Sequence, residues 1–221
     1  MEKRTITVKG IGKVKLKVDY IVISLELSSL NKDYEKTMSL ASSKLNSLTN
    51  SLVDAGFEKQ EIKTAKYEVQ PVYESIRDEQ GNYRDEFLGF KCVHMLKLSF
   101  DFDMPILNKI LLAITKSEAN PKIHISFTVK DQTKISNEVL KLSCEDAKRK
   151  AEILCHASGY SLGALLKIDY NWNESYFESK TRYENTSVFA KHKICFYEDA
   201  DNIEPEDIEV SDSAVFIWEI A

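Results

Sequence analysis

Two glycines flank an isoleucine near the start of the chain, in the stretch TVKGIGKVKLKV at residues 7–18. A Gly-x-Gly pair could cradle a phosphate, but a dinucleotide-binding fingerprint needs a third glycine and a helix directly after it. Here lysines and apolar residues alternate after Gly12, which is the pattern of a strand with one charged and one apolar face. We therefore interpret the glycine pair as a bulge or bend in β-structure and expect no cofactor there.

The chain also has four cysteines, whose thiols could bind a metal or act as nucleophiles. They are Cys92, Cys144, Cys155 and Cys195. Their spacing matches no zinc motif, and Cys144 and Cys155, about 16 Å apart on one helix, are too distant for a disulfide. We expect reduced, buried thiols and no metal. The alternative is a metal site in which His192 and Cys195 join Cys155 and His156.

A catalytic triad needs a nucleophile, a base and an orienting group, and the chain has only four histidines as bases. His94 and His124 lie in strand patterns, whereas His156 lies near a helix C-terminus, where a cation is favoured. Neither a Gly-x-Ser-x-Gly elbow nor a His-Glu-x-x-His helix is present. We expect no catalytic residues, and a protein that is not an enzyme.

Composition and charge limit the class of protein further. The 221 residues are 43% hydrophobic and 29% charged, with a net charge of −5. These values are typical of a soluble globular protein with no bulk attraction to nucleic acid or anionic membranes. No apolar run approaches the roughly 20 residues of a membrane span. The start, MEKRTITVKG, lacks the apolar core of a secretory signal, so we expect a cytoplasmic protein, with a periplasmic mature form as the alternative.

The first half of the chain has the pattern of a ferredoxin-like fold. The expected elements are a long strand to about 28 with a bend at Asp19-Tyr20, a helix over 34–55, strands over 63–76 and 84–102, a helix over 104–117 and a strand over 123–129. Asp33 and Gly56 are suited to cap the first helix. The order strand, helix, strand, strand, helix, strand is that of the split βαβ arrangement, with both helices on one face of the sheet.

The second half indicates a different α+β layer. It has a long helix over 133–158 closed by Gly159, a strand over 162–172, a polar loop over 173–186, and strands over 188–197 and 213–220. The predicted fold class is thus α+β with two antiparallel-sheet subdomains. The ferredoxin-like subdomain, 13–131, is inserted into a second one formed by 1–12 plus 132–221.

The long helix carries a densely charged stretch, EDAKRKAE at residues 145–152. We interpret it as a solvated face with Glu145–Arg149 and Asp146–Lys150 pairs, rather than as a basic binding patch. Ala147 and Ala151 lie four residues apart on one side. Their small side chains would let this helix approach a sheet or another helix closely.

Two groups of residues are candidates for an interaction surface. Lysines form a ladder on the exposed side of the early strands, where they either contact an anionic partner or protect a strand edge. Aromatic side chains lie among polar residues further on, which suits either a protein interface or a loop folded back on its own domain. The candidates are Lys9, Lys13, Lys15, Lys17, Tyr170, Trp172, Tyr176 and Phe177. Trp218, in the last strand, is expected in the core.

Several motifs together resemble the SIMPL family, also called DUF541. They are Thr5–Gly12 with its glycine pair, Val18-Asp19 where the family usually has Pro-Asp, Ile62–Tyr73 with its I-x-T and P-x-Y elements, and Asp146–Gly163 with its D-A-x-x-K-A helix and L-G turn. The resemblance covers nearly the whole chain. It implies a protein that oligomerises or binds partners without catalysis. The family includes periplasmic bacterial members, some forming rings and linked to oxidative-stress tolerance, and a cytosolic animal protein that binds an interleukin-receptor-associated kinase.

We therefore expect a non-enzymatic binding or scaffold protein that forms a homo-oligomer and has a possible protein partner. We expect neither nucleic-acid binding nor membrane insertion. The alternative function is binding of a small ligand, or catalysis, in a cleft between the two subdomains.

Overall fold

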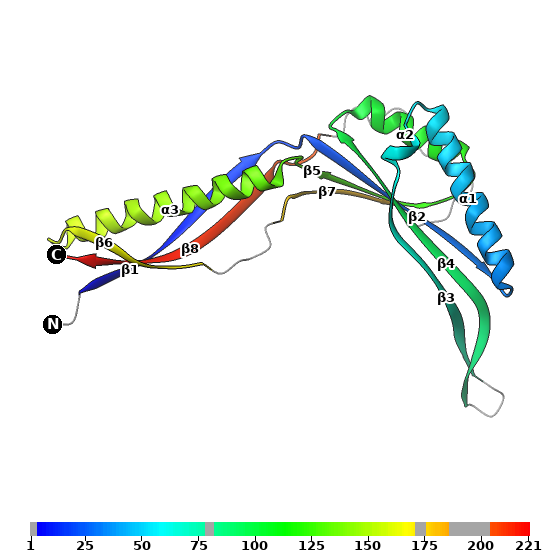
Figure 1. Cartoon of the computed structure of the whole chain (residues 1–221), viewed down its shortest axis with the longest axis horizontal. Coiled ribbons are helices and arrows are strands. Elements are labelled where there is room, and N and C mark those ends of the chain that lie inside the picture. The colour runs from blue at the N-terminus through cyan, green and yellow to red at the C-terminus, as the bar shows by residue number, and fades with distance from the viewer. Residues whose placement is uncertain (1–3, 78–81, 171–175, 186–203) are drawn as a thin grey trace. The chain divides into compact units, whose positions relative to one another are not determined.

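The computed structural model describes residues 4–77, 82–170, 176–185 and 204–221. Its elements are β1 (Thr5–Leu16), β2 (Tyr20–Asn31), α1 (Tyr34–Asp54), a 3-10 turn (Lys59–Glu61), β3 (Lys63–Arg77), β4 (Tyr83–Asp101), α2 (Met104–Lys116), β5 (Lys122–Thr128), α3 (Gln132–Ala157), β6 (Leu162–Asp169), β7 (Glu178–Asn185) and β8 (Ile208–Ile220) (Figure 1). The strands form one sheet in the order β1-β8-β6 and another in the order β3-β4-β2-β5-β7. The expected α+β class with two antiparallel sheets is confirmed.

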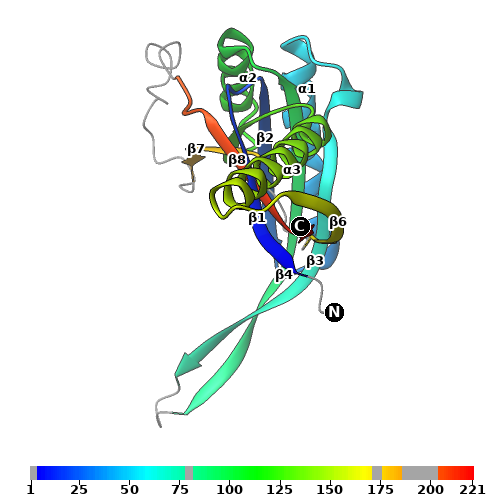
Figure 2. The same ribbon diagram turned by 90° about the vertical axis from the view of Figure 1, so that its left-hand side faces the viewer.

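The larger sheet has the predicted ferredoxin-like order. Strands β3, β4, β2 and β5 lie side by side, and β2 and β3 both run antiparallel to β4. Helices α1 and α2 lie on one face of this sheet (Figures 1 and 2). Alternate residues of β2, from Ile21 to Leu27, point to that face and are almost fully buried, because successive side chains of a strand alternate between its faces.

Helix α1 begins and ends where the sequence predicts. The Asp33 side chain accepts a hydrogen bond of 3.1 Å from the Lys36 backbone N–H, which satisfies one of the unpaired donors of the first turn. Gly56 follows the helix with φ of +93°, a conformation that glycine adopts without a steric penalty. Leu48 and Leu52 of the predicted apolar stripe are fully buried.

The glycine pair does not bend β1, so that prediction was wrong. The register of β1 with β8 is continuous from Thr5↔Glu219 to Leu16↔Ile208. A Cβ at Gly10 would overlap the Ser143 carbonyl oxygen, and one at Gly12 would overlap the Val139 carbonyl oxygen. The glycines therefore let the backbone of α3 lie directly against the strand.

Near Asp19 the apolar side chains change from even to odd positions in the sequence. The cause is not the predicted bend within one long strand. Here the chain leaves the smaller sheet after β1 and enters the larger sheet as β2. Asp19 is tied to the end of β5, because its backbone N–H donates to the Thr128 carbonyl at 3.2 Å. Its carboxylate accepts from the Lys130 N–H at 2.8 Å.

Helix α3 packs on the smaller sheet through small residues, as predicted. Ala147 and Ala151 are fully buried. They belong to one apolar cluster with Val8 of β1 and with Ala214, Phe216 and Trp218 of β8. The rings of Phe216 and Trp218 stack at 5.4 Å, so Trp218 is a core residue, as expected.

The chain folds into two compact units whose borders differ from the expected ones. The unit formed by both termini comprises Met1–Asp19, Thr128–Lys180 and Pro205–Ala221, and the other comprises Tyr20–Phe127 and Thr181–Glu204. The expected border at residue 13 falls inside β1, which pairs with β8 along its whole length. Residues 13–16 therefore belong to the terminal unit.

The C-terminal elements also correct the sequence analysis. Residues 178–185, predicted as loop, form β7 at the edge of the larger sheet. This strand has no apolar alternation to reveal it. Strand β8 begins at Ile208 instead of 213, and β6 ends at Asp169 instead of 172. The predicted strand at 188–197 lies outside the described residues.

Candidate functional site

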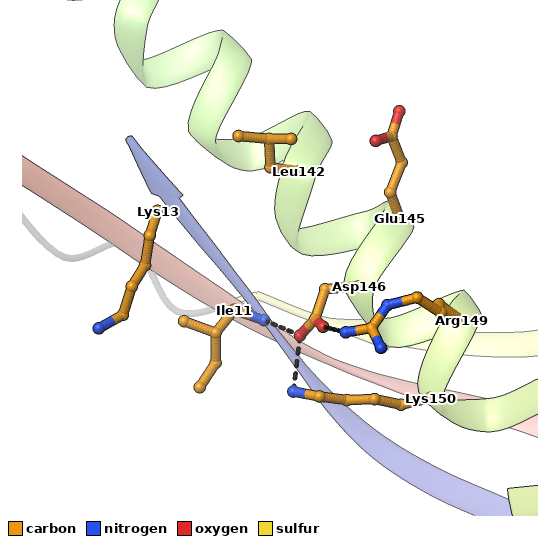
Figure 3. A pocket seen from close by; sticks show the side chains of 7 residues that line it. All are labelled: Ile11, Lys13, Leu142, Glu145, Asp146, Arg149 and Lys150. Atoms are coloured by element: carbon orange, nitrogen blue, oxygen red, sulfur yellow. Dashed lines mark hydrogen bonds and ion pairs between the residues drawn. The ribbon is translucent and has the colours of Figure 1, made fainter. Parts of the chain in front are cut away.

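The charged stretch of α3 meets the Gly-Ile-Gly stretch of β1 at a surface hollow. Its walls come from two elements, β1 and α3 (Figure 3). The lining residues are Ile11, Lys13, Leu142, Glu145, Asp146, Arg149 and Lys150.

Asp146 is the centre of this cluster. Its carboxylate accepts hydrogen bonds from the Ile11 backbone N–H at 2.9 Å, from Arg149 at 2.6 Å and from Lys150 at 2.6 Å. The Lys150 ammonium also donates to the Lys9 carbonyl oxygen at 3.2 Å. Because β1 is an edge strand among those that the structure describes, its outward N–H and C=O groups have no strand partner there. Asp146 and Lys150 supply one, and we call this set of contacts the edge clasp.

These bonds decide the chemistry of the carboxyl group. The hydrogen bond from Lys150, then that from the Ile11 N–H, lowers the pKa of Asp146 to about 2, because both donors stabilise the charged form. The group is therefore a carboxylate at any physiological pH, and three donors occupy its oxygens. Such a carboxylate holds two elements together and is unsuited to general acid–base work, which needs a pKa near the working pH.

The predicted ion pairs of α3 are confirmed in one case and wrong in the other. Asp146 pairs with Lys150, as expected. Arg149 pairs with Asp146, three residues before it, instead of with Glu145. Figure 3 shows the reason, because the Glu145 side chain points away from the cluster.

The lysine ladder lies on the sheet face that α3 does not cover. Lys9, Lys13 and Lys15 are exposed at alternate positions of β1, and Lys17 follows the strand. Lys13 pairs with Glu209 and Lys15 with Asp207, both at 3.3 Å. These pairs neutralise the middle of the ladder. Because all four partners are solvated, the pairs contribute little stability.

The aromatic candidates have different environments. The Tyr170 hydroxyl donates to the Asp212 carboxylate at 2.8 Å, and this bond raises the pKa of Tyr170. Phe177 is half-buried in an apolar cluster around Val139 and Val210, so it serves the core. Tyr176 is 76% exposed. Trp172 lies outside the described residues.

The thiols and imidazoles do not converge in the described parts of the chain. Cys92 and Cys155 are buried as predicted, whereas Cys144 is exposed. No cluster of three metal-binding side chains occurs among the residues that the structure describes. His192 and Cys195, which the alternative metal site requires, lie outside them.

Sequence reasoning missed two features. His94 is a buried histidine on β4, with a 3.0 Å contact between its Nε2 and the Thr64 hydroxyl, and burial lowers its pKa. Leu165, Leu166 and Ile168 of β6 are 46%, 43% and 53% exposed. An apolar run of this kind is typical of a buried strand, so the sequence alone does not indicate that these side chains are exposed.

The fold defines a two-unit α+β protein in which the glycine pair of β1 and the charged stretch of α3 join these two elements. The chain belongs to the SIMPL family, described as a protein of unknown function (DUF541), whose profile it matches over residues 6–218. The resemblance seen in the sequence is thus confirmed. No curated protein matches the chain. None of the helices in the described ranges has the length and apolar character to cross a bilayer.

Proposed function

We propose that this chain is a non-catalytic binding or scaffold module of the cytoplasm that self-associates through β6. The observation that carries the proposal is the apolar surface of this strand. Leu165 lies opposite Trp218 and Ile168 lies opposite Phe216, so both point to the sheet face on which α3 packs. They are nevertheless about half exposed.

The position of α3 explains this exposure. Its buried residues pack on β1 and β8, and of β6 only Leu162 joins their apolar cluster. None of the described elements covers Leu165 and Ile168 fully. The outer edge of β6 has no strand partner among the described residues. Adjacent exposed aliphatic side chains on a soluble protein commonly mark an interaction site.

The two edges of this sheet differ in a way that supports the proposal. The edge of β1 is closed by Asp146 and Lys150 and flanked by lysines, which are common devices against strand pairing. On β6 the only charged residues, Lys167 and Asp169, pair with each other at 2.8 Å. A second copy would therefore meet an apolar strip with little net charge.

The chemistry of the edge clasp supports a non-catalytic role. Its ionisable groups are engaged in joining α3 to β1. A shifted pKa at such a position has a structural explanation, which weakens the case for a catalytic one.

Light scattering coupled to size exclusion tests the proposal. We expect the wild-type chain to be an oligomer, and a Leu165→Lys/Ile168→Lys variant to dissociate at a concentration roughly a hundredfold higher. Ile153→Lys is the matched control, because Ile153 is 56% exposed on α3 of the same unit. A monomeric wild-type chain, or an oligomer that the β6 variant leaves intact, would contradict the proposal.

A further inference from the structure

The hairpin of β3 and β4 extends past the end of β2 as a two-stranded ribbon (Figures 1 and 2). Strand β2 makes its last pair with β4 at Asn31↔Phe90, whereas β3 and β4 remain paired from Val72↔Gly89 to Arg77↔Tyr83. A two-stranded ribbon is marginally stable in water unless something packs on it. This one exposes Tyr73 and Tyr83, at 58% and 74%.

The ribbon has a defined root. Gly89 has φ of +143°, and a Cβ there would overlap the Asn31 carbonyl oxygen. The register shifts at the same place, between Val72 and Tyr73. Such a bulge sets the direction in which a strand pair leaves a sheet.

One face of the ribbon is aromatic. The rings form a continuous row, in which Tyr73 contacts Phe87 at 5.5 Å and Phe87 contacts Phe90 at 5.3 Å. Tyr34, the first residue of α1, then contacts Phe90 at 5.5 Å. The row thus connects the exposed ribbon to the helix-covered face of the sheet.

The other face has two glutamates at its centre, and Arg84 lies opposite Ile76 nearer its tip. Glu74 lies directly opposite Glu86, an arrangement that is destabilising because like charges face each other. Neither carboxylate makes an ion pair with any residue that the structure describes. Val72 and Ile76, two positions away on either side of Glu74, are half-buried apolar residues on this face.

From these features we propose that the outer edge of β3 in the ribbon, residues 72–77, binds an extended segment of another protein in which basic and apolar residues alternate. No strand in the described part of the chain pairs with this edge, since β3 is the outermost strand of its sheet. A strand added there places alternate side chains on the two faces of the ribbon. Basic side chains then meet Glu74 and Glu86, and apolar ones meet the Tyr73–Phe87 row.

The charges decide which kind of segment fits. A basic residue removes the repulsion between the two glutamates, whereas an acidic segment would add to it. Apolar residues on the opposite face cover the exposed ring of Tyr73 and the half-buried ring of Phe87. This inference is independent of the proposed self-association through β6, because the ribbon belongs to the other unit of the chain.

The test uses the full chain and a defined probe. The probe is a capped peptide, Lys-Val-Lys-Leu-Lys-Val, which alternates as required, and its control is Lys-Lys-Lys-Val-Leu-Val, with the same composition and charge. Both are titrated into ¹⁵N-labelled protein and followed by NMR. We expect the alternating peptide to shift the backbone amide signals of residues 72–77, and the control peptide to bind more weakly.

Variants make the test specific. We expect Glu74→Gln/Glu86→Gln to weaken binding of the alternating peptide about tenfold, and Glu138→Gln/Glu152→Gln, two exposed carboxylates of α3, to leave it unchanged. Equal binding of both peptides, signal shifts elsewhere, or equal affinity of the two variants would overturn the proposal. If Glu74→Gln/Glu86→Gln instead abolished self-association, the occupant would be a second copy, and the proposal of a foreign segment would be wrong.

Discussion

Replacing Asp146 by asparagine tests the edge clasp directly. The change keeps the shape of the side chain and an oxygen that can accept from the Ile11 N–H, but it removes the charge that Arg149 and Lys150 share. We therefore expect the variant to fold as the wild type does and to be less stable near neutral pH.

The size of the loss follows from the pKa. Lowering the carboxyl pKa from 3.8 to about 2 corresponds to roughly 2 kcal/mol, at about 1.36 kcal/mol per pH unit. The Asp146 side chain is only 16% exposed, but those of Arg149 and Lys150 are 64% and 38% exposed, so solvent screens part of this energy. We expect the free energy of unfolding of the variant to be lower by about 1–2 kcal/mol.

The pH dependence gives a second readout. Because the pKa of Asp146 is lower in the folded chain, its stabilising effect is fully present above the unfolded value of 3.8 and is lost as the pH falls through about 2. Denaturant unfolding of wild type and Asp146→Asn should therefore differ at neutral pH and converge near that acid limit.

The matched control is Glu145→Gln, which removes the same charge from the neighbouring residue that points away from the cluster (Figure 3). Its free energy of unfolding should stay within about 0.5 kcal/mol of the wild-type value. Equal stability of Asp146→Asn and wild type at neutral pH, or a difference that persists at the acid limit, would refute the reasoning about the clasp.

Further predictions concern packing, pH and thiol access. Gly12→Ala should lower the free energy of unfolding by about 3 kcal/mol or more, because its Cβ would overlap the α3 backbone. Gly159→Ala, where a Cβ meets nothing within 4 Å, should cost only about 1 kcal/mol from its positive φ; equal losses would contradict this. Burial lowers the pKa of His94, so stability should fall as the pH drops below the unfolded value of 6.5, and thermal melting of His94→Gln should show a weaker decline. Maleimide should label the exposed Cys144 in the folded chain and the buried Cys92 only after unfolding, as mass spectrometry would show.

Helix α1 and the order of elements from β2 to β5 could be predicted because the residues that indicate each element are close together in the sequence. Asp33 and Gly56 mark the two ends of α1 within one helix length, and the order of elements from β2 to β5 indicates the ferredoxin-like arrangement. Strand β7 was not predicted, because residues 178–185, ESKTRYEN, have no alternation of apolar and polar side chains. Its place at a sheet edge is decided by pairing with a neighbour and not by burial of one face.

The sequence by itself determined the helices, most of the strands, the α+β class and the membership in the SIMPL family. It also indicated that Ala147 and Ala151 would allow close packing of α3, but not what they would pack on. Only the tertiary structure showed that Gly10 and Gly12 lie against the backbone of α3, and that Asp146 and Lys150 satisfy the edge of the same strand. These contacts join residues more than 120 positions apart, and β1 becomes an edge strand only when it pairs with β8. No periodicity or spacing along the chain carries that information.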